Sequence, residues 1–191
     1  MKILSKILAE AGEWLYSLII ACALALVINV FIFHPTTVLG QSMEPTLRDG
    51  QYIILSRLGH TLGRIPAYND IVVIDSRVNR NRNLRDDLTE PVQNVAVLLK
   101  GLEPNHNMWV KRVVGLPGDT IEFKNGKVYR NNTPLDEAYI KEPMQYRSDR
   151  TVTVPAGHIF VLGDNRNNSS DSRYIGSVPV DHVMGVMVLK L

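Results

Sequence analysis

The first residue that could carry chemistry is a serine in a short polar stretch. Gly40-Gln41-Ser42-Met43-Glu44 begins like the nucleophile elbow of some hydrolases, but Glu44 stands where the second glycine belongs. No HExxH motif, phosphate-binding glycine loop or candidate cysteine nucleophile is present. A serine hydroxyl is a weak nucleophile until a neighbouring base removes its proton. Taken alone, Ser42 is therefore a loop serine.

Composition disfavours metal, disulfide and nucleic-acid chemistry. None of the five histidines has a neighbour at the short spacing of zinc ligands, and Cys22 is the single cysteine. Lys and Arg total 21 against 19 acidic residues, a balance that does not suggest nucleic-acid binding. We therefore expect no metal, no cofactor and no nucleic-acid partner.

A membrane-length apolar run lies near the N-terminus. From Leu15 to Phe33 the sequence has no charged residue, and a helix of that length spans about 28 Å, close to the ~30 Å of a bilayer core. A buried globular helix and a cleaved secretory signal are the alternatives. The run is longer than the roughly 7–15 apolar residues of such a signal, which favours a membrane anchor.

The charges that flank this run indicate its orientation. Lys2 and Lys6 precede it, whereas only Arg48 lies within the next 15 or so residues, which favours a cytoplasmic N-terminus. We expect residues 1–34 to form a cytoplasmic stub and anchor helix, and residues 35–191 to form an extracytoplasmic domain.

Beyond the apolar run, short β-branched segments of strand length alternate with turn signals. Asn125-Gly126 predicts a type I′ hairpin between its flanking segments. The sequence therefore predicts a mostly β domain. The predicted strands cover residues 51–56, 70–75, 108–114, 120–123, 158–162 and 183–189.

Residues 76–107 depart from this pattern. They contain four arginines interleaved with asparagine, then Asp86-Asp87 and a short apolar patch, Val95–Leu99. This segment is either a patch attracted to anionic lipid headgroups or a solvated excursion between strands, and the second interpretation is favoured.

Four further motifs follow the apolar run in a fixed order: Ser42-Met-Glu-Pro-Thr-Leu47, Asp70-Ile-Val-Val73, Lys111-Arg-Val-Val-Gly-Leu-Pro-Gly-Asp119 and Gly163-Asp-Asn-Arg-Asn-Asn-Ser-Ser-Asp-Ser-Arg173. With these motifs the sequence closely resembles bacterial type I signal peptidases of peptidase family S26. These are membrane-bound Ser/Lys endopeptidases that remove signal peptides from exported preproteins. The resemblance covers nearly the whole chain outside residues 76–107.

The resemblance implies one transmembrane helix followed by a β-rich catalytic domain of the signal-peptidase type. It also implies a monomer in the bacterial plasma membrane or the thylakoid membrane, with the signal peptides of exported preproteins as substrates and the lipid bilayer as a partner.

The resemblance further implies that Ser42 is the nucleophile and Lys111 its general base. An ordinary lysine has a pKa near 10.4, so only about one in 2,500 is neutral at pH 7. Burial among apolar groups lowers a lysine pKa by as much as about 3 to 5 units. Trp109 and Val113 share the strand face of Lys111, and Arg112 faces the opposite way. These apolar neighbours suit a neutral amine.

Supporting roles follow from the same resemblance. Ser169 aligns with the serine that orients the lysine amine. Gly40 stands where some family members carry a serine whose hydroxyl helps to stabilise the oxyanion, so the backbone N–H groups of Ser42 and Gly40 are the candidate donors. The residues expected to hold the active-site loop through ion pairs are Asp164, Arg166, Asp171 and Arg173, with Arg112 as a further member.

Signal peptides end in a small-x-small pattern before the cleaved bond. In an extended substrate, the first and third residues before that bond point to the same side. The resemblance implies two shallow pockets for them, and core packing is the alternative role for the residues concerned. These pocket residues are Val38, Met43, Leu47 and Val110.

Two other classes of protein share these features. Soluble Ser/Lys self-cleaving repressors have a similar β fold but carry an N-terminal DNA-binding domain in place of the apolar run. An inactive, membrane-tethered β domain that binds exported chains is the second alternative, and composition does not reject it.

Overall fold

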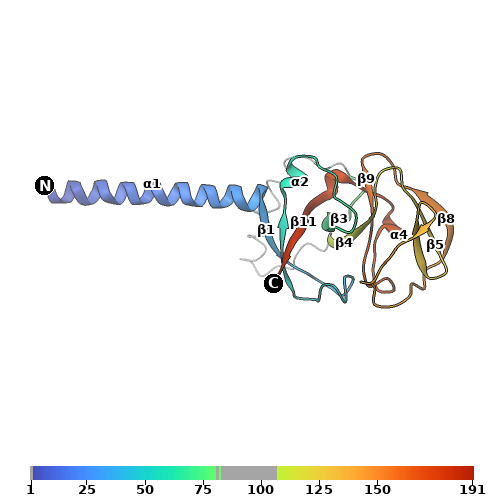
Figure 1. Ribbon diagram of the computed structural model, residues 1–191. Coiled ribbons are helices and arrows are strands. Elements are labelled where there is room, and N and C mark those ends of the chain that lie inside the picture. Colours follow the sequence, from blue (N-terminus) through green and yellow to red (C-terminus); the bar gives the residue numbers. More distant parts are fainter. Residues whose placement is uncertain (1, 81, 83–106) are drawn as a thin grey trace.

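A computed structural model describes residues 2–80, 82 and 107–191, with only part of the side chains of the first helix. Figure 1 shows one long helix projecting from a β-rich body. The helices are α1 (Lys2–Phe31), α2 (Leu58–Thr61), α4 (Ser172–Ile175) and the 3-10 helix η1 (Val180–His182). The strands are β1 (Phe33–Thr37), β2 (Tyr52–Ser56), β3 (Ile71–Asp75), β4 (Met108–Gly115), β5 (Thr120–Lys124), β6 (Lys127–Arg130), β7 (Thr133–Pro134), β8 (Ser148–Thr153), β9 (His158–Leu162), β10 (Val178–Pro179) and β11 (Val183–Lys190). The mostly β prediction is confirmed.

Helix α1 stands apart from the body, with its N-terminal end far from the sheets (Figure 1). Its large apolar side chains between Trp14 and Ile28 are exposed where they are described. By length and mean hydropathy, no helix among the described residues qualifies as a membrane span. The helix ends at Phe31, and Phe33, which the apolar run included, pairs with Ser56 as part of β1. The following Pro35 disfavours helix at His34, so the chain becomes extended here.

The larger sheet has seven strands in the order β1-β2-β11-β3-β4-β9-β10. Its centre is buried on both faces, because Ile71 and Val73 of β3 pack into one apolar cluster while Val72 and Ile74 pack into another. β4 lies antiparallel to β3, and Val72 is the register partner of Lys111. The sheet therefore places a lysine beside its most buried strand.

The smaller sheet has the order β7-β6-β5-β8. Asn125 and Gly126 join β5 to β6 with φ angles of 54° and 72°, which confirms the predicted type I′ hairpin. Gly115 is the point of close contact, because an added Cβ would lie 2.9 Å from Ile121 and 3.1 Å from Phe160. This approach joins the end of β4 to a core that includes residues of both sheets.

All six predicted strands form, and none of their ends differs from the predicted bound by more than one residue. β1, β8 and the two-residue strands β7 and β10 were not predicted. β1 contains a proline, which an edge strand tolerates, and β8 is a polar strand of which only Val152 is apolar.

Only the margins of the 76–107 segment are described. The carboxylate of Asp75 accepts hydrogen bonds from Arg77 and, at 2.7 Å, from Arg82. These hydrogen bonds pair the buried carboxylate of Asp75 at the end of β3. The apolar patch Val95–Leu99 lies outside the described residues, so both interpretations of this segment stay predictions.

Candidate active site

Ser42 and Lys111 meet although 69 positions separate them in the sequence. The Nζ of Lys111 donates a hydrogen bond to Ser42 Oγ at 2.8 Å and a second one to the carbonyl oxygen of Val110 at 2.9 Å. Lys111 is 3% exposed, and its Nζ lies 5.6 Å from the centre of the Trp109 ring. The hydroxyl and the amine are thus in direct contact in a nearly dry setting.

Burial changes the protonation of this amine. Loss of solvent penalises the ammonium form and lowers the pKa of Lys111 from 10.5 to about 8, although the negative charges of Asp171 and Asp164 oppose that shift. No carboxylate lies within ion-pairing distance of Nζ in the described part of the chain. The amine is therefore able to accept a proton near neutral pH.

The loop that carries Ser42 is fixed by the apolar residues around it. Met43 and Leu47 are fully buried, and the N–H of Leu47 donates to the carbonyl of Met43 at 2.9 Å. Together with Val38 they belong to the core cluster of β2, β3 and β11. Val38, Met43 and Leu47 are therefore core residues in this structure and do not line the cavity beside Ser42, so their role as substrate-pocket residues stays a prediction.

A cavity of about 460 Å³ opens beside the Ser42 hydroxyl. Of the four expected pocket residues, only Val110 lines it. Its other apolar walls come from Leu39, Met108, Trp109 and Tyr174. Its polar lining comes from Gln41, Lys111 and the segment Asn167–Ser170. The dyad thus faces a space large enough for part of an extended peptide.

Gly163, which directly follows β9, opens one of the four motifs, but the sequence analysis gave it no role of its own. An added Cβ would lie 2.5 Å from the carbonyl oxygen of Ser42 and closer still to the side chain of Ser169. That same carbonyl accepts the N–H of Asn165 at 3.0 Å. Only glycine lets the two loops meet this closely, and a glycine directly after a buried strand was the available signal.

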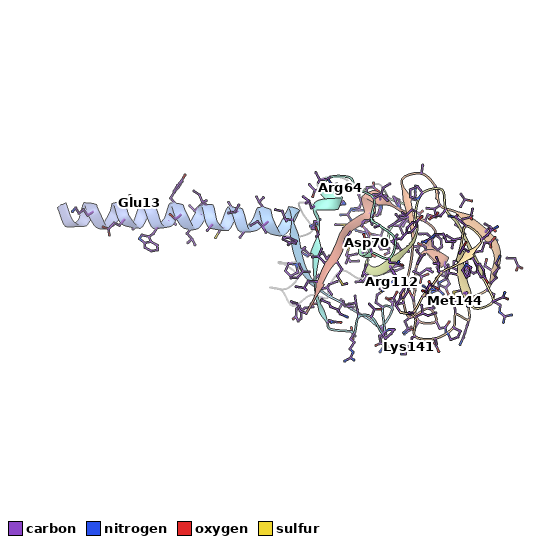
Figure 2. All side chains as sticks on the ribbon, viewed as in Figure 1. Glu13, Arg64, Asp70, Arg112, Lys141 and Met144 are labelled. Carbon is purple, nitrogen blue, oxygen red and sulfur yellow. The ribbon has the colours of Figure 1, made fainter. Side chains whose placement is uncertain are left out.

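Buried ion pairs hold the loop that follows Gly163. Asp164 accepts two hydrogen bonds from Arg112, at 2.8 and 2.7 Å, and Asp171 accepts two from Arg173, both at 2.8 Å. Arg166 likewise donates two hydrogen bonds to Glu137. The sequence analysis did not identify Glu137, because it lies 29 positions from Arg166. Figure 2 shows Arg112 within the body of the molecule.

The hydrogen-bond partners of Ser169 and Gly40 differ from those that their expected roles require. The Ser169 hydroxyl donates to Asp171 Oδ2 at 2.8 Å, and no hydrogen bond joins it to Lys111 among the described residues; the Val110 carbonyl holds the amine instead. The N–H of Gly40 is likewise occupied, because it donates to Asp49 Oδ1 at 2.8 Å. The orienting role of Ser169 therefore stays a prediction without a direct contact to support it, and the N–H of Gly40 already has an acceptor.

A serine hydroxyl bonded to a dry lysine amine, open on one side to a cavity, is the arrangement of a serine hydrolase that uses lysine as its base. Comparisons with known proteins specify the class further. Residues 11–191 match the family model described as signal peptidase, peptidase S26.

Two sequence relatives agree with this match. A probable signal peptidase I-1 of Synechocystis is 36% identical over 168 residues, which cover 88% of this chain and 76% of that protein. Signal peptidase IB of Staphylococcus aureus is 29% identical over 193 residues, covering 92% and 86% of the two chains. A solved signal peptidase I from Enterococcus faecalis V583 is 30% identical, covers 65% of this chain and 98% of its own, and has a TM-score of 0.44.

The chain belongs to the signal peptidase family, peptidase S26, and within it to type I. Its activity is the removal of signal peptides from preproteins, and signal peptidases are associated with membranes. Family membership decides against both the self-cleaving repressor and the inactive binding domain.

Proposed function

We propose that this signal peptidase cleaves its substrates with Ser42 as nucleophile and Lys111 as general base. The observation that carries the proposal is the 2.8 Å hydrogen bond between Nζ and Oγ at a lysine that is 3% exposed. With a pKa of about 8, roughly one amine in ten is neutral at pH 7, which is several hundredfold more than for a solvated lysine.

The reaction proceeds in two halves. Neutral Lys111 takes the proton of Ser42 Oγ while that oxygen attacks the carbonyl carbon of the scissile peptide bond. The bond breaks, Lys111 returns the proton to the departing amine of the mature protein, and the signal peptide remains as an ester on Ser42. Water then attacks the ester, with Lys111 again accepting a proton, and releases the signal peptide as a carboxylic acid.

The cavity walls support cleavage after a small-x-small sequence. Met108 and Val110 lie two residues apart on β4, line the cavity and pack against the same core cluster. An extended substrate beside β4 presents its first and third residues before the cleaved bond to one side, with the same period of two. We infer that these packed side chains form shallow subsites, which suit small substrate residues at those positions.

We further propose that the apolar run Leu15–Phe33 anchors the protein in the lipid bilayer, with the N-terminus in the cytoplasm and the β body outside. Supporting this, the run has no charged residue, and its described large side chains are exposed on a helix that projects from the body. Such a surface is costly in water and stable in lipid. Protease added to sealed right-side-out vesicles should digest the β body, and protection of that body would reverse the orientation.

The catalytic proposal is tested with purified protein in detergent and a preprotein substrate. Ser42→Ala and Lys111→Ala should each abolish processing, whereas Lys124→Ala, which removes an exposed lysine of the distant smaller sheet, should process normally. Unchanged processing by either of the first two variants would defeat the proposal. Circular dichroism of all variants separates loss of chemistry from loss of fold.

A further inference from the structure

An acyl-transfer site needs hydrogen-bond donors for the oxyanion, and only part of that requirement is accounted for. The N–H of Ser42 has no acceptor within the described ranges, so it is available as one donor. The N–H of Gly40 is not available, because it already donates to Asp49. A second donor must therefore come from another group on the cavity wall.

Three of the side-chain amide and hydroxyl groups on that wall already donate hydrogen bonds within the protein. The amide nitrogen of Asn167 donates to Glu142 Oε1 and to the carbonyl of Pro143, and the hydroxyl of Ser169 donates to Asp171. The amide nitrogen of Asn168 donates to Gln41 Oε1 at 3.4 Å. These groups serve the loop itself or its neighbours.

The amide nitrogen of Gln41 is different. Gln41 lines the cavity, its side-chain oxygen faces Asn168, and its Nε2 has no acceptor among residues 2–80, 82 and 107–191. Because Gln41 directly precedes Ser42, its Cα is joined through a single peptide unit to the free N–H of Ser42. The hydrogen bond from Asn168 favours the amide orientation in which Oε1 is held and Nε2 is left to donate.

We propose that the side-chain amide of Gln41 is the second oxyanion donor, acting beside the backbone N–H of Ser42. This inference rests on the proposed role of Ser42 and adds a catalytic residue to it. The amide contributes where negative charge develops on the carbonyl oxygen, so it stabilises the transition state more than the bound substrate. Asn168 is then a positioning residue, since it acts only through Gln41.

The test compares kinetics of preprotein cleavage. Gln41→Ala and Gln41→Glu should each lower kcat by about 10²–10³-fold with little change in KM, because both remove the N–H donor. Asn168→Ala should lower kcat less, since Gln41 keeps its donor. The matched control is Gln145→Ala, which removes an exposed glutamine that does not line the cavity and should leave kcat unchanged.

A binding measurement separates catalysis from substrate affinity. In the Ser42→Ala background, a signal-peptide substrate should bind equally well with and without the additional Gln41→Ala substitution. Weaker binding by the same factor as the loss in kcat/KM would overturn the inference.

Two kinetic outcomes would also overturn the inference. One is a Gln41→Ala enzyme within about threefold of wild type. The other is a fall in kcat of about 10²–10³-fold that occurs only in Ser170→Ala or Tyr174→Phe, because these two residues carry further side-chain hydroxyls on the cavity wall. Failure of the dyad proposal looks different, because Ser42→Ala would then stay active.

Discussion

Lys111 and Arg112 are neighbours on β4, both are cationic and both are buried, yet their surroundings are opposite. Arg112 has a carboxylate partner, Asp164, which binds it through two hydrogen bonds. Burial alone would lower the pKa of Arg112, but the bonds to Asp164 raise it above its ordinary value. Lys111 has a hydroxyl and a carbonyl as its partners, and burial lowers its pKa to about 8.

This difference shows how one strand separates structure from chemistry. A guanidinium stays charged and fits a carboxylate with two parallel bonds, so it suits a fixed joint between β4 and the loop after β9. An ammonium group that is dried without a counter-ion gives up its proton more readily. The absence of an ion-pair partner at Lys111, within the described residues, is therefore as important as its contact with Ser42.

The largest effect is expected when position 111 carries arginine, as position 112 does. Lys111→Arg keeps a cation at the site but removes a group that can become neutral, so activity should fall by about 10²–10⁴-fold. Cleavage of a preprotein measures the loss. A variant with more than a tenth of wild-type activity would show that charge alone is sufficient at this position.

The next effect is on stability. Asp164→Ala leaves Arg112 buried without its partner, which costs about 3–5 kcal/mol of unfolding free energy. Thermal and denaturant unfolding measure this loss, and Glu122→Gln, at an exposed ion pair with Lys124, serves as the control with almost no change expected. Equal shifts in the two variants would mean that the Arg112 pair is not a buried joint.

Lys111→Met tests the cost of drying the amine. The pKa of Lys111 is lower in the folded state than in the unfolded chain, so wild-type stability rises with pH between about 8 and 10.5. Below that window the folded protein carries a penalty of about 3 kcal/mol, which methionine removes. The variant should be more stable than wild type at pH 7, and this advantage should vanish near pH 10.5. A pH-independent difference would argue against the lowered pKa.

The smallest effect is expected at Ser169. Its hydroxyl binds Asp171, whose carboxylate keeps Arg173 and the N–H of Gly163 when the hydroxyl is lost. Ser169→Ala should therefore reduce kcat only a few-fold, without moving the pH profile. A loss comparable to that of Lys111→Ala would instead mean that Ser169 orients the amine during turnover.

The sequence was most informative where local patterns decide the structure. β-Branched runs located six strands, and Asn125-Gly126 located the hairpin, because strand and turn preferences act over a few residues. The contact between Ser42 and Lys111 could be predicted only from the resemblance to a family, because 69 positions separate the two residues.

Long-range partners account for what the sequence did not predict. Met43 and Leu47 flank the nucleophile, but the same apolar character suits a pocket or a core, and only the fold shows that they are core. Glu137 carries no local sign of its bond to Arg166. Asp49, nine positions further along the chain, accepts the N–H of Gly40, so this N–H is not available as the expected oxyanion donor.

The pH dependence of kcat/KM tests the central claim most directly. If neutral Lys111 is the base, kcat/KM measured on a preprotein rises with pH and levels off through an apparent pKa of about 8. A midpoint near 10.5, or a flat profile from pH 6 to 10, would contradict a dried and titrating amine beside Ser42.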